Sequence, residues 1–208
     1  MAIERNVPPL VLASGSPRRR LLLSMAGYEF EVVAPDITEL RRPGEPPEEL
    51  VVRLAGEKAA VVAAGQPFGT CVIGFDTSVV LDRAVLGKPA DEAEAAAMLL
   101  TLAGRTHTVY TGFCLTIAGS DEAEIGIEAS RVTMRAVTQD EAESYAATGE
   151  PLDKAGAYAL QGKGRGFVTR VAGLRSTVIG LPLEPVVDLL RRRGIFPARA
   201  GGEGMNAV

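Results

Sequence analysis

The sequence contains no tryptophan, a single histidine and only two cysteines among its 208 residues. One histidine, His107, and the lack of any Cys-x-x-Cys pair argue against a zinc site of the usual kind. No partners of His107 stand at a spacing that suggests a catalytic triad, so we predict a structural role for it. Cys71 and Cys114 each lie in an apolar stretch, which predicts small buried side chains rather than a disulfide or metal ligands.

Aromatic residues make up only 5% of the chain, with four tyrosines and six phenylalanines. Acidic residues outnumber basic ones by 26 to 22, which gives a net charge of −4. A nucleic-acid-binding module needs a basic surface and rings on which bases stack, so this class of protein is disfavoured. Any polyanion that the chain handles must therefore be held by a local cluster of cations.

Long apolar runs are also absent, and none approaches the ~18 residues that cross a bilayer. Residues 1–9 carry two prolines and two opposite charges, and they lack the apolar centre of a signal peptide. We therefore expect no membrane partner and a cytoplasmic location.

The pattern of apolar residues predicts the fold class. At 47% hydrophobic, the chain is not globally disordered, and its length suits one domain that buries roughly 70% of its unfolded surface. Helical periodicity predicts helices over 18–26, 48–64, 91–102, 138–148 and 183–193. Apolar or alternating stretches predict strands over 10–13, 28–33, 71–81, 107–117, 125–137, 167–171 and 176–179. Because helices and strands intermix, we predict an α/β fold with a mixed sheet. Residues 1–193 form one domain in this prediction, and residues 194–208 a flexible C-terminal tail.

The segment from Ser14 to Arg19 combines a strand end, a Ser-Gly-Ser turn and a helix start. Ser16 suits the N-cap and Pro17 the first helical position, so the positive end of this helix faces the turn. Two serine hydroxyls and the guanidinium groups of Arg18 and Arg19 complete a cradle suited to phosphate oxygens. The alternative is an ordinary capped helix with a solvated basic first turn, although basic residues there oppose the helix dipole.

Asp76 interrupts the most strand-like segment and places a carboxylate near the sheet, where desolvation is costly without a role or a partner. Lys88 stands in a Gly-Lys-Pro turn that could bring its ammonium towards this carboxylate, and an ion pair without catalytic role is the simpler alternative. Lys58 lies on or beside the apolar face of helix 48–64, so it either snorkels to solvent or points into a cleft. The turn-rich run 150–162 holds two acids, a lysine, a tyrosine and an amide, but its pattern alone names no reaction.

Several short segments occur in one order along the chain: Ser-Gly-Ser-Pro-Arg-Arg at 14–19, Glu-Lys-Ala at 57–59, Asp-Thr at 76–77 with Leu-Gly-Lys-Pro at 86–89, Tyr-Thr-Gly at 110–112, Glu-Pro-Leu-Asp-Lys-Ala-Gly-Ala-Tyr at 150–158 with Gln-Gly at 161–162, and Gly-Leu-Pro-Leu at 180–183. In this order they resemble the Maf family of septum-formation proteins, which are nucleoside triphosphate pyrophosphatases. The resemblance runs over about residues 10–192, nearly the whole chain. It implies an elongated, twisted mixed sheet with flanking helices, two lobes and a deep cleft, similar to inosine triphosphatases.

The same resemblance implies hydrolysis of a nucleoside triphosphate between the α and β phosphates, which gives a monophosphate and pyrophosphate. It implies a divalent metal, Mg²⁺ or Mn²⁺, as cofactor. Arg18, Thr77 and Gln161 follow the dTTP/UTP branch of the family, and modified pyrimidine nucleotides share the same handles. The expected partner is therefore a small nucleotide, and the choice between monomer and homodimer stays open.

Residue roles also follow from the resemblance. Asp76 would be the general base that takes a proton from the attacking water, and Asp76 with Glu39 would offer hard oxygen ligands to the metal. Lys58 and Lys88 would act in catalysis by neutralising phosphate charge. The expected substrate-binding residues are Ser14, Ser16, Arg18, Arg19, Thr77, Lys154 and Gln161.

A second hypothesis is a non-catalytic, nucleotide-binding regulator of cell division. It keeps the cationic cradle but does not need Asp76 as a base. Release of pyrophosphate from dTTP in the presence of metal separates the two hypotheses.

Overall fold

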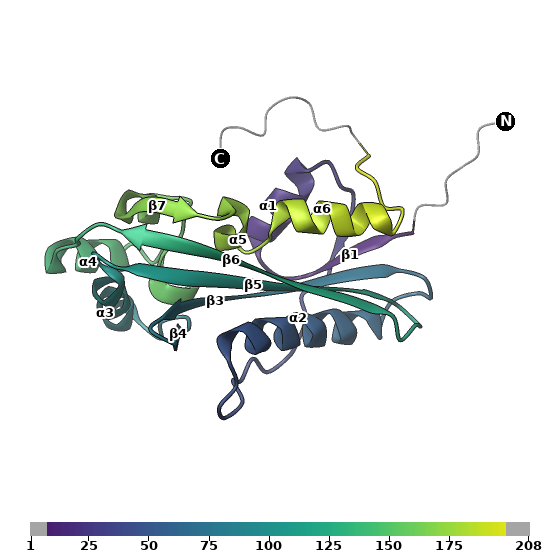
Figure 1. Cartoon of the computed structure of the whole chain (residues 1–208), viewed down its shortest axis with the longest axis horizontal. Helices are drawn as coiled ribbons and strands as arrows, with labels where there is room; N and C mark the ends of the chain where they lie inside the picture. Colours follow the sequence, from purple (N-terminus) through teal and green to yellow (C-terminus); the bar gives the residue numbers. More distant parts are fainter. Residues whose placement is uncertain (1–7, 199–208) are drawn as a thin grey trace.

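The computed structural model describes residues 8–198, which form an elongated α/β body around one mixed, twisted sheet (Figure 1). Its strands are β1 (Leu10–Ala13), β2 (Glu31–Val32), β3 (Cys71–Leu81), β4 (Ala84–Leu86), β5 (Thr106–Ile117), β6 (Ala123–Met134) and β7 (Val168–Ala172). They follow the order β2-β1-β3-β5-β6-β7, and β4 pairs with β3 outside this path. β1 is parallel to β2 and β3, whereas all other pairs are antiparallel. The predicted fold class is confirmed.

Helices flank the sheet on both faces. Figure 1 shows α2 (Pro47–Ala63) against one face and α1 (Pro17–Met25) and α6 (Leu183–Arg192) against the other. The helices α3 (Glu92–Leu102) and α4 (Gln139–Ala146) lie at the opposite end of the long strands. A short helix, α5 (Arg175–Ile179), and two 3₁₀ turns, η1 (Ala155–Ala157) and η2 (Lys163–Phe167), complete the described fold.

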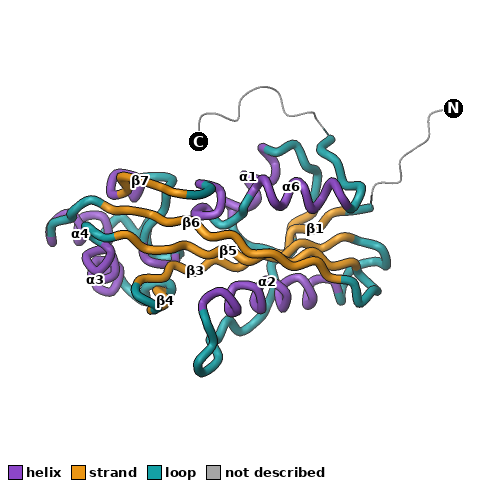
Figure 2. Tube along the Cα trace, viewed as in Figure 1, coloured by secondary structure: helices purple, strands orange, loops and turns teal. Residues whose placement is uncertain are grey.

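Two hydrophobic cores lie along the sheet, one at each end of the long strands. The first core includes Ile73 and Phe75 of β3 together with side chains of α1 and α6. The second includes Val79 and Leu81 of the same strand together with side chains of α3 and α4. The long strands run from one end to the other (Figure 2). Each end of the sheet therefore has its own core, and β3 contributes to both.

Between the two cores, one edge of β3 has no neighbouring strand. β1 stops where Ala13 pairs with Gly74, and β4 begins only where Leu86 pairs with Val79. Residues 75–78 are therefore paired with β5 on one side alone. Side chains in a strand alternate between faces, so this bare edge can present residues from both faces to one opening.

The helix α2 lies unusually close to the sheet because glycines face it. A Cβ on Gly74 would come within 2.4 Å of the Ala55 carbonyl oxygen, and one on Gly112 within 2.4 Å of the Val51 carbonyl oxygen. Only glycine leaves room for the helix backbone at these two positions.

Some elements differ from the sequence-based prediction. Residues 176–179 form part of α5 rather than a strand, so that prediction is wrong. The β-branched run Thr177-Val178-Ile179 favours a strand, but Gly180, at a φ of 112°, closes a helical turn by donating to Ser176 and Thr177. The strand predicted over 28–33 is reduced to β2, and β4 was not predicted because its three residues follow a turn directly.

Several smaller predictions concern buried groups. Cys71 and Cys114 are buried, as predicted. His107 is buried too, with its Nε2 2.6 Å from the Tyr158 hydroxyl, and burial lowers the pKa of His107 to about 4. Over residues 8–198, no helix has the length and apolar character needed to cross a membrane.

The tail was expected to begin at residue 194. Ile195 is buried in the first core, and the Ala198 amide donates to the Gly27 carbonyl, so packed structure continues to residue 198. The rest of the expected tail, 199–208, lies outside the described residues.

The close approach of α2 predicts a stability difference between two glycine substitutions. Gly112→Ala should lower the free energy of unfolding by about 1–3 kcal/mol, because its Cβ meets the backbone of Val51. Gly56→Ala is the control, since it lies within α2 and its Cβ meets nothing within 4 Å. That change should raise the free energy of unfolding by about 0.5–1 kcal/mol. Urea unfolding measures both, and a Gly112→Ala protein as stable as the parent would contradict the packing argument.

Candidate active site

A cleft of about 420 Å³ opens at the bare edge of β3. Its walls come from the β1–α1 turn, α2, β3, the segment after β4, the run 153–161 and α5. Every site residue predicted from the sequence lines this one cleft: Ser14, Ser16, Arg18, Arg19, Glu39, Lys58, Asp76, Thr77, Lys88, Lys154 and Gln161. Folding therefore gathers side chains that are up to 147 positions apart, while their individual roles remain predictions.

The turn between β1 and α1 forms the floor of the cleft. Ser16 is the N-cap of α1, Pro17 is its first residue, and the Ser14 hydroxyl accepts from the Ser16 amide at 3.2 Å. No acidic side chain in the first turn offsets the positive end of the helix. This end therefore stays available to an anion.

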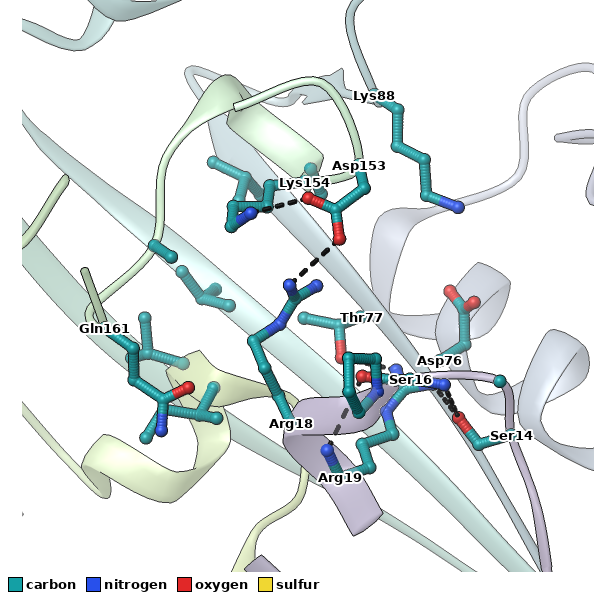
Figure 3. A pocket seen from close by; sticks show the side chains of 18 of the residues that line it. Ser14, Ser16, Arg18, Arg19, Asp76, Thr77, Lys88, Asp153, Lys154 and Gln161 are labelled. Atoms are coloured by element: carbon teal, nitrogen blue, oxygen red, sulfur yellow. Dashed lines mark hydrogen bonds and ion pairs between the residues drawn. The ribbon is translucent and has the colours of Figure 1, made fainter. Parts of the chain in front are cut away.

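Arg19 is held by acceptors from three separate elements. Its guanidinium donates to the Gly180 carbonyl at 2.7 Å. It also donates to the Ser14 hydroxyl at 3.2 Å and to the Thr77 hydroxyl at 3.0 Å (Figure 3). Burial lowers the pKa of Arg19 below its ordinary value, but a guanidinium remains charged at any physiological pH. Arg19 is thus a fixed positive charge.

Arg18 points across the cleft to the run 153–161. Its Nη1 lies 3.1 Å from Asp153 Oδ2, and Lys154 Nζ lies 2.5 Å from Asp153 Oδ1 (Figure 3). Burial acts to raise the pKa of Asp153, but hydrogen bonds from Lys154 and Arg18 lower it below its ordinary value. Asp153 therefore aligns two of the predicted substrate-binding cations, and sequence reasoning assigned it no role. Its position in the run 150–162, directly before Lys154, was the available signal.

Lys58, Asp76 and Glu39 form a compact charged group on the α2 side of the cleft. Lys58 Nζ lies 2.6 Å from Asp76 Oδ1 and 2.7 Å from Glu39 Oε1. The lysine is only 5% exposed, so it points into the cleft instead of snorkelling to solvent. The ion partner of Asp76 is thus a lysine of α2, and not Lys88 as the simpler alternative required.

The three charges shift the pKa of both carboxyl groups. Burial raises the pKa of Asp76 above its ordinary value, although Lys58 and Arg19 oppose this effect. Burial acts in the same direction on Glu39, but there the hydrogen bond and charge of Lys58, with the charges of Lys88 and Arg19, lower the pKa. The pKa values of the two neighbouring carboxyl groups are therefore shifted in opposite directions, that of Asp76 upwards and that of Glu39 downwards.

The remaining predicted residues lie further along the cleft. Figure 3 shows the Lys88 side chain entering from the wall opposite the β1–α1 turn, and Gln161 at a distance from the cationic group. Five cations and three carboxylates line the cleft. The cleft is thus positively charged within a chain of net charge −4.

A divalent metal can be tested against the donor set. Among residues 8–198, no three histidine, cysteine or acidic side chains are grouped so as to hold a metal. The carboxylates of Glu39 and Asp76, however, converge on one ammonium group. Mg²⁺ is commonly held by one or two carboxylates, with substrate phosphates and water completing its shell. The residues present therefore fit a metal that arrives together with a phosphate substrate.

Comparisons with known proteins identify relatives over almost the full chain. A "dTTP/UTP pyrophosphatase" of Myxococcus xanthus is 53% identical over 192 residues, which cover 92% of this chain and 96% of the relative. A protein of the same name from Vibrio cholerae is 45% identical over 187 residues, covering 90% and 99%. A solved HAM1 protein from Coxiella burnetii is 18% identical with a TM-score of 0.44, covering 61% of this chain and 73% of its own. That last likeness is too loose to bear on fold or function.

The family model described as "Maf-like protein" matches residues 9–193. This range contains the whole cleft and all the ordered motifs that suggested the resemblance. The chain belongs to the Maf-like protein family.

Proposed function

We propose that this protein hydrolyses dTTP and UTP to the monophosphate and pyrophosphate. Modified pyrimidine nucleotides that carry the same recognition groups are included in this proposal. The observation that carries the proposal is a buried carboxylate, Asp76, beside a group of cations in one cleft. The names of the relatives from M. xanthus and V. cholerae support the same substrates. We place the reaction in the cytoplasm, as expected from the sequence.

The cations of the cleft can neutralise the negative charge of the triphosphate, which is the main obstacle to the reaction. A triphosphate carries about four negative charges at neutral pH, and these repel an attacking water until they are neutralised. Arg19 offers a charge that is already fixed by three acceptors, so little reorganisation is needed when phosphate binds. Arg18 and Lys154 share Asp153, and both can turn their remaining donors to the substrate.

Asp76 suits the role of general base. Its raised pKa makes the carboxylate a better proton acceptor than an ordinary aspartate, and Lys58 keeps it ionised and oriented at 2.6 Å. A metal held by Asp76 and Glu39 would supply Lewis acidity and lower the pKa of a bound water. The relatives are named pyrophosphatases, which supports catalysis over a non-catalytic regulator, so we favour the enzyme.

The first prediction concerns Asp76→Asn. This protein should lose at least about a hundredfold in kcat, since the amide cannot accept the proton, while dTTP still binds. Asp82→Asn is the matched control, because Asp82 directly follows β3 and has an exposed side chain outside the cleft. Pyrophosphate release and equilibrium binding of dTTP measure the two properties. Full turnover by Asp76→Asn would remove the base assignment.

A second prediction uses the pH profile. A base works only when deprotonated, so turnover should fall as the pH drops through the pKa of Asp76. Lys58 opposes the raised pKa, so Lys58→Met should move this acidic limb of kcat to higher pH. The position of the limb is the measurement, because the height of the profile also falls when a phosphate-neutralising charge is lost. A limb that stays in place would show that Asp76 does not set it.

A third prediction addresses the metal. Glu39→Gln should require at least about tenfold more Mg²⁺ for half-maximal turnover, because one hard oxygen ligand becomes a weaker one. Asp36→Asn, in the same loop but outside the cleft, is the control. Titration of activity with Mg²⁺ after EDTA treatment gives both values, and equal requirements would exclude Glu39 as a ligand.

A further inference from the structure

A chain of hydroxyl groups lies on the face of the sheet opposite Asp76. Thr77 of β3 and Thr111 of β5 are direct cross-strand partners, and their hydroxyl oxygens are 3.0 Å apart. Thr111 is completely buried, and its hydroxyl oxygen lies 2.8 Å from the Thr177 carbonyl oxygen of α5. The series therefore links the cleft wall to α5.

Counting protons fixes the direction of each hydrogen bond. A carbonyl can only accept, so the Thr111 hydroxyl donates its single proton to the Thr177 carbonyl oxygen. The contact between the two threonines then requires Thr77 to donate. Arg19 in turn donates to Thr77 at 3.0 Å and occupies one of its two lone pairs. The Thr77 hydroxyl is left with one lone pair and no proton to offer.

We propose that Thr111 is a positioning residue that makes Thr77 an obligate hydrogen-bond acceptor towards the cleft. Thr77 lines the cleft, whereas Thr111 does not. An ionised phosphate oxygen cannot donate, so it is excluded as a direct partner of this lone pair. Within a bound nucleotide, the groups that can donate to this lone pair belong to the nucleoside and are either a base N–H or a sugar O–H. This inference rests on the proposed function, and it deepens the account of substrate choice.

Because Thr77 can only accept a hydrogen bond from the cleft, it can distinguish between pyrimidine bases. Uracil and thymine carry an N–H at ring position 3, whereas cytosine carries a lone pair there. A lone pair facing the Thr77 lone pair is repelled, while an N–H is bound. Without the Thr111 hydroxyl, Thr77 can rotate its proton towards the cleft. It can then donate to cytosine or accept from uracil, so it binds both bases.

The test measures binding of non-hydrolysable α,β-methylene analogues of UTP, CTP and 3′-deoxy-UTP, with Mg²⁺, by calorimetry. Thr111→Val removes the hydroxyl at nearly constant shape, and Thr111→Ser keeps it. The hydroxyl-free protein should lose at least about fivefold of the parent's preference for UTP over CTP if the donor is the base. It should lose that much of the preference over 3′-deoxy-UTP if the donor is the sugar. Thr111→Ser should keep both ratios within about twofold.

Thr116→Val is the matched control, because it deletes a hydroxyl from the same strand at a half-buried position outside the cleft, where the hydroxyl donates to the Glu122 carbonyl. Thr111→Ala serves as the second hydroxyl-free protein if the valine variant does not fold. Unchanged ratios in a folded hydroxyl-free protein, or an equal loss of affinity for all three analogues, would overturn the inference. Turnover of UTP by the parent is assayed separately, so failure of the proposed activity is distinguishable from failure at Thr111.

Discussion

The bare edge of β3 between β1 and β4 is the constraint on which the rest of the cleft depends. A strand with neighbours on both sides would direct Asp76 and Thr77 into separate layers, because adjacent side chains point to opposite faces. With residues 75–78 paired on one side only, both side chains reach the same opening. One face contributes the basic carboxylate, and the other contributes the arginine and hydroxyl network.

The buried ion pair between Lys58 and Asp76 makes the stability of the fold sensitive to the loss of either residue. Removal of one partner from a buried ion pair typically costs about 3–5 kcal/mol, because the other charge is left without compensation. Lys58 and Asp76 meet only because α2 lies directly on Gly74 and Gly112. Two residues without side chains, neither of which lines the cleft, thus determine the distance between the lysine and the carboxylate. Burial of Asp76 costs folding free energy, and the same burial raises the pKa of this carboxylate towards a value that suits proton transfer.

The sequence supports much of this picture, but unevenly. The long strands and α2 follow from periodicity. The family resemblance selected the predicted site residues, and the fold brings them to one cleft. The sequence pattern alone did not decide whether Lys58 reaches solvent or points into the cleft, because its direction depends on how closely α2 approaches the sheet. Thr111 was visible within a motif, but its effect depends on the direction of a proton that only cross-strand register reveals. The helix α5 was missed because β-branched residues favour strands until tertiary contacts decide otherwise.

The buried thiol of Cys114 gives the protein a built-in reporter of the α2 contact. Cys114 pairs with Gly74 across the ladder and packs against Ala55 and Ala59 of α2. Burial raises the pKa of this thiol to about 11, so it is almost unreactive while the helix stays down. The rate at which a maleimide or disulfide reagent modifies it therefore follows how often α2 lifts from the sheet. The same event separates Lys58 from Asp76, so the modification rate of this native cysteine also follows the opening of the charged group in the cleft.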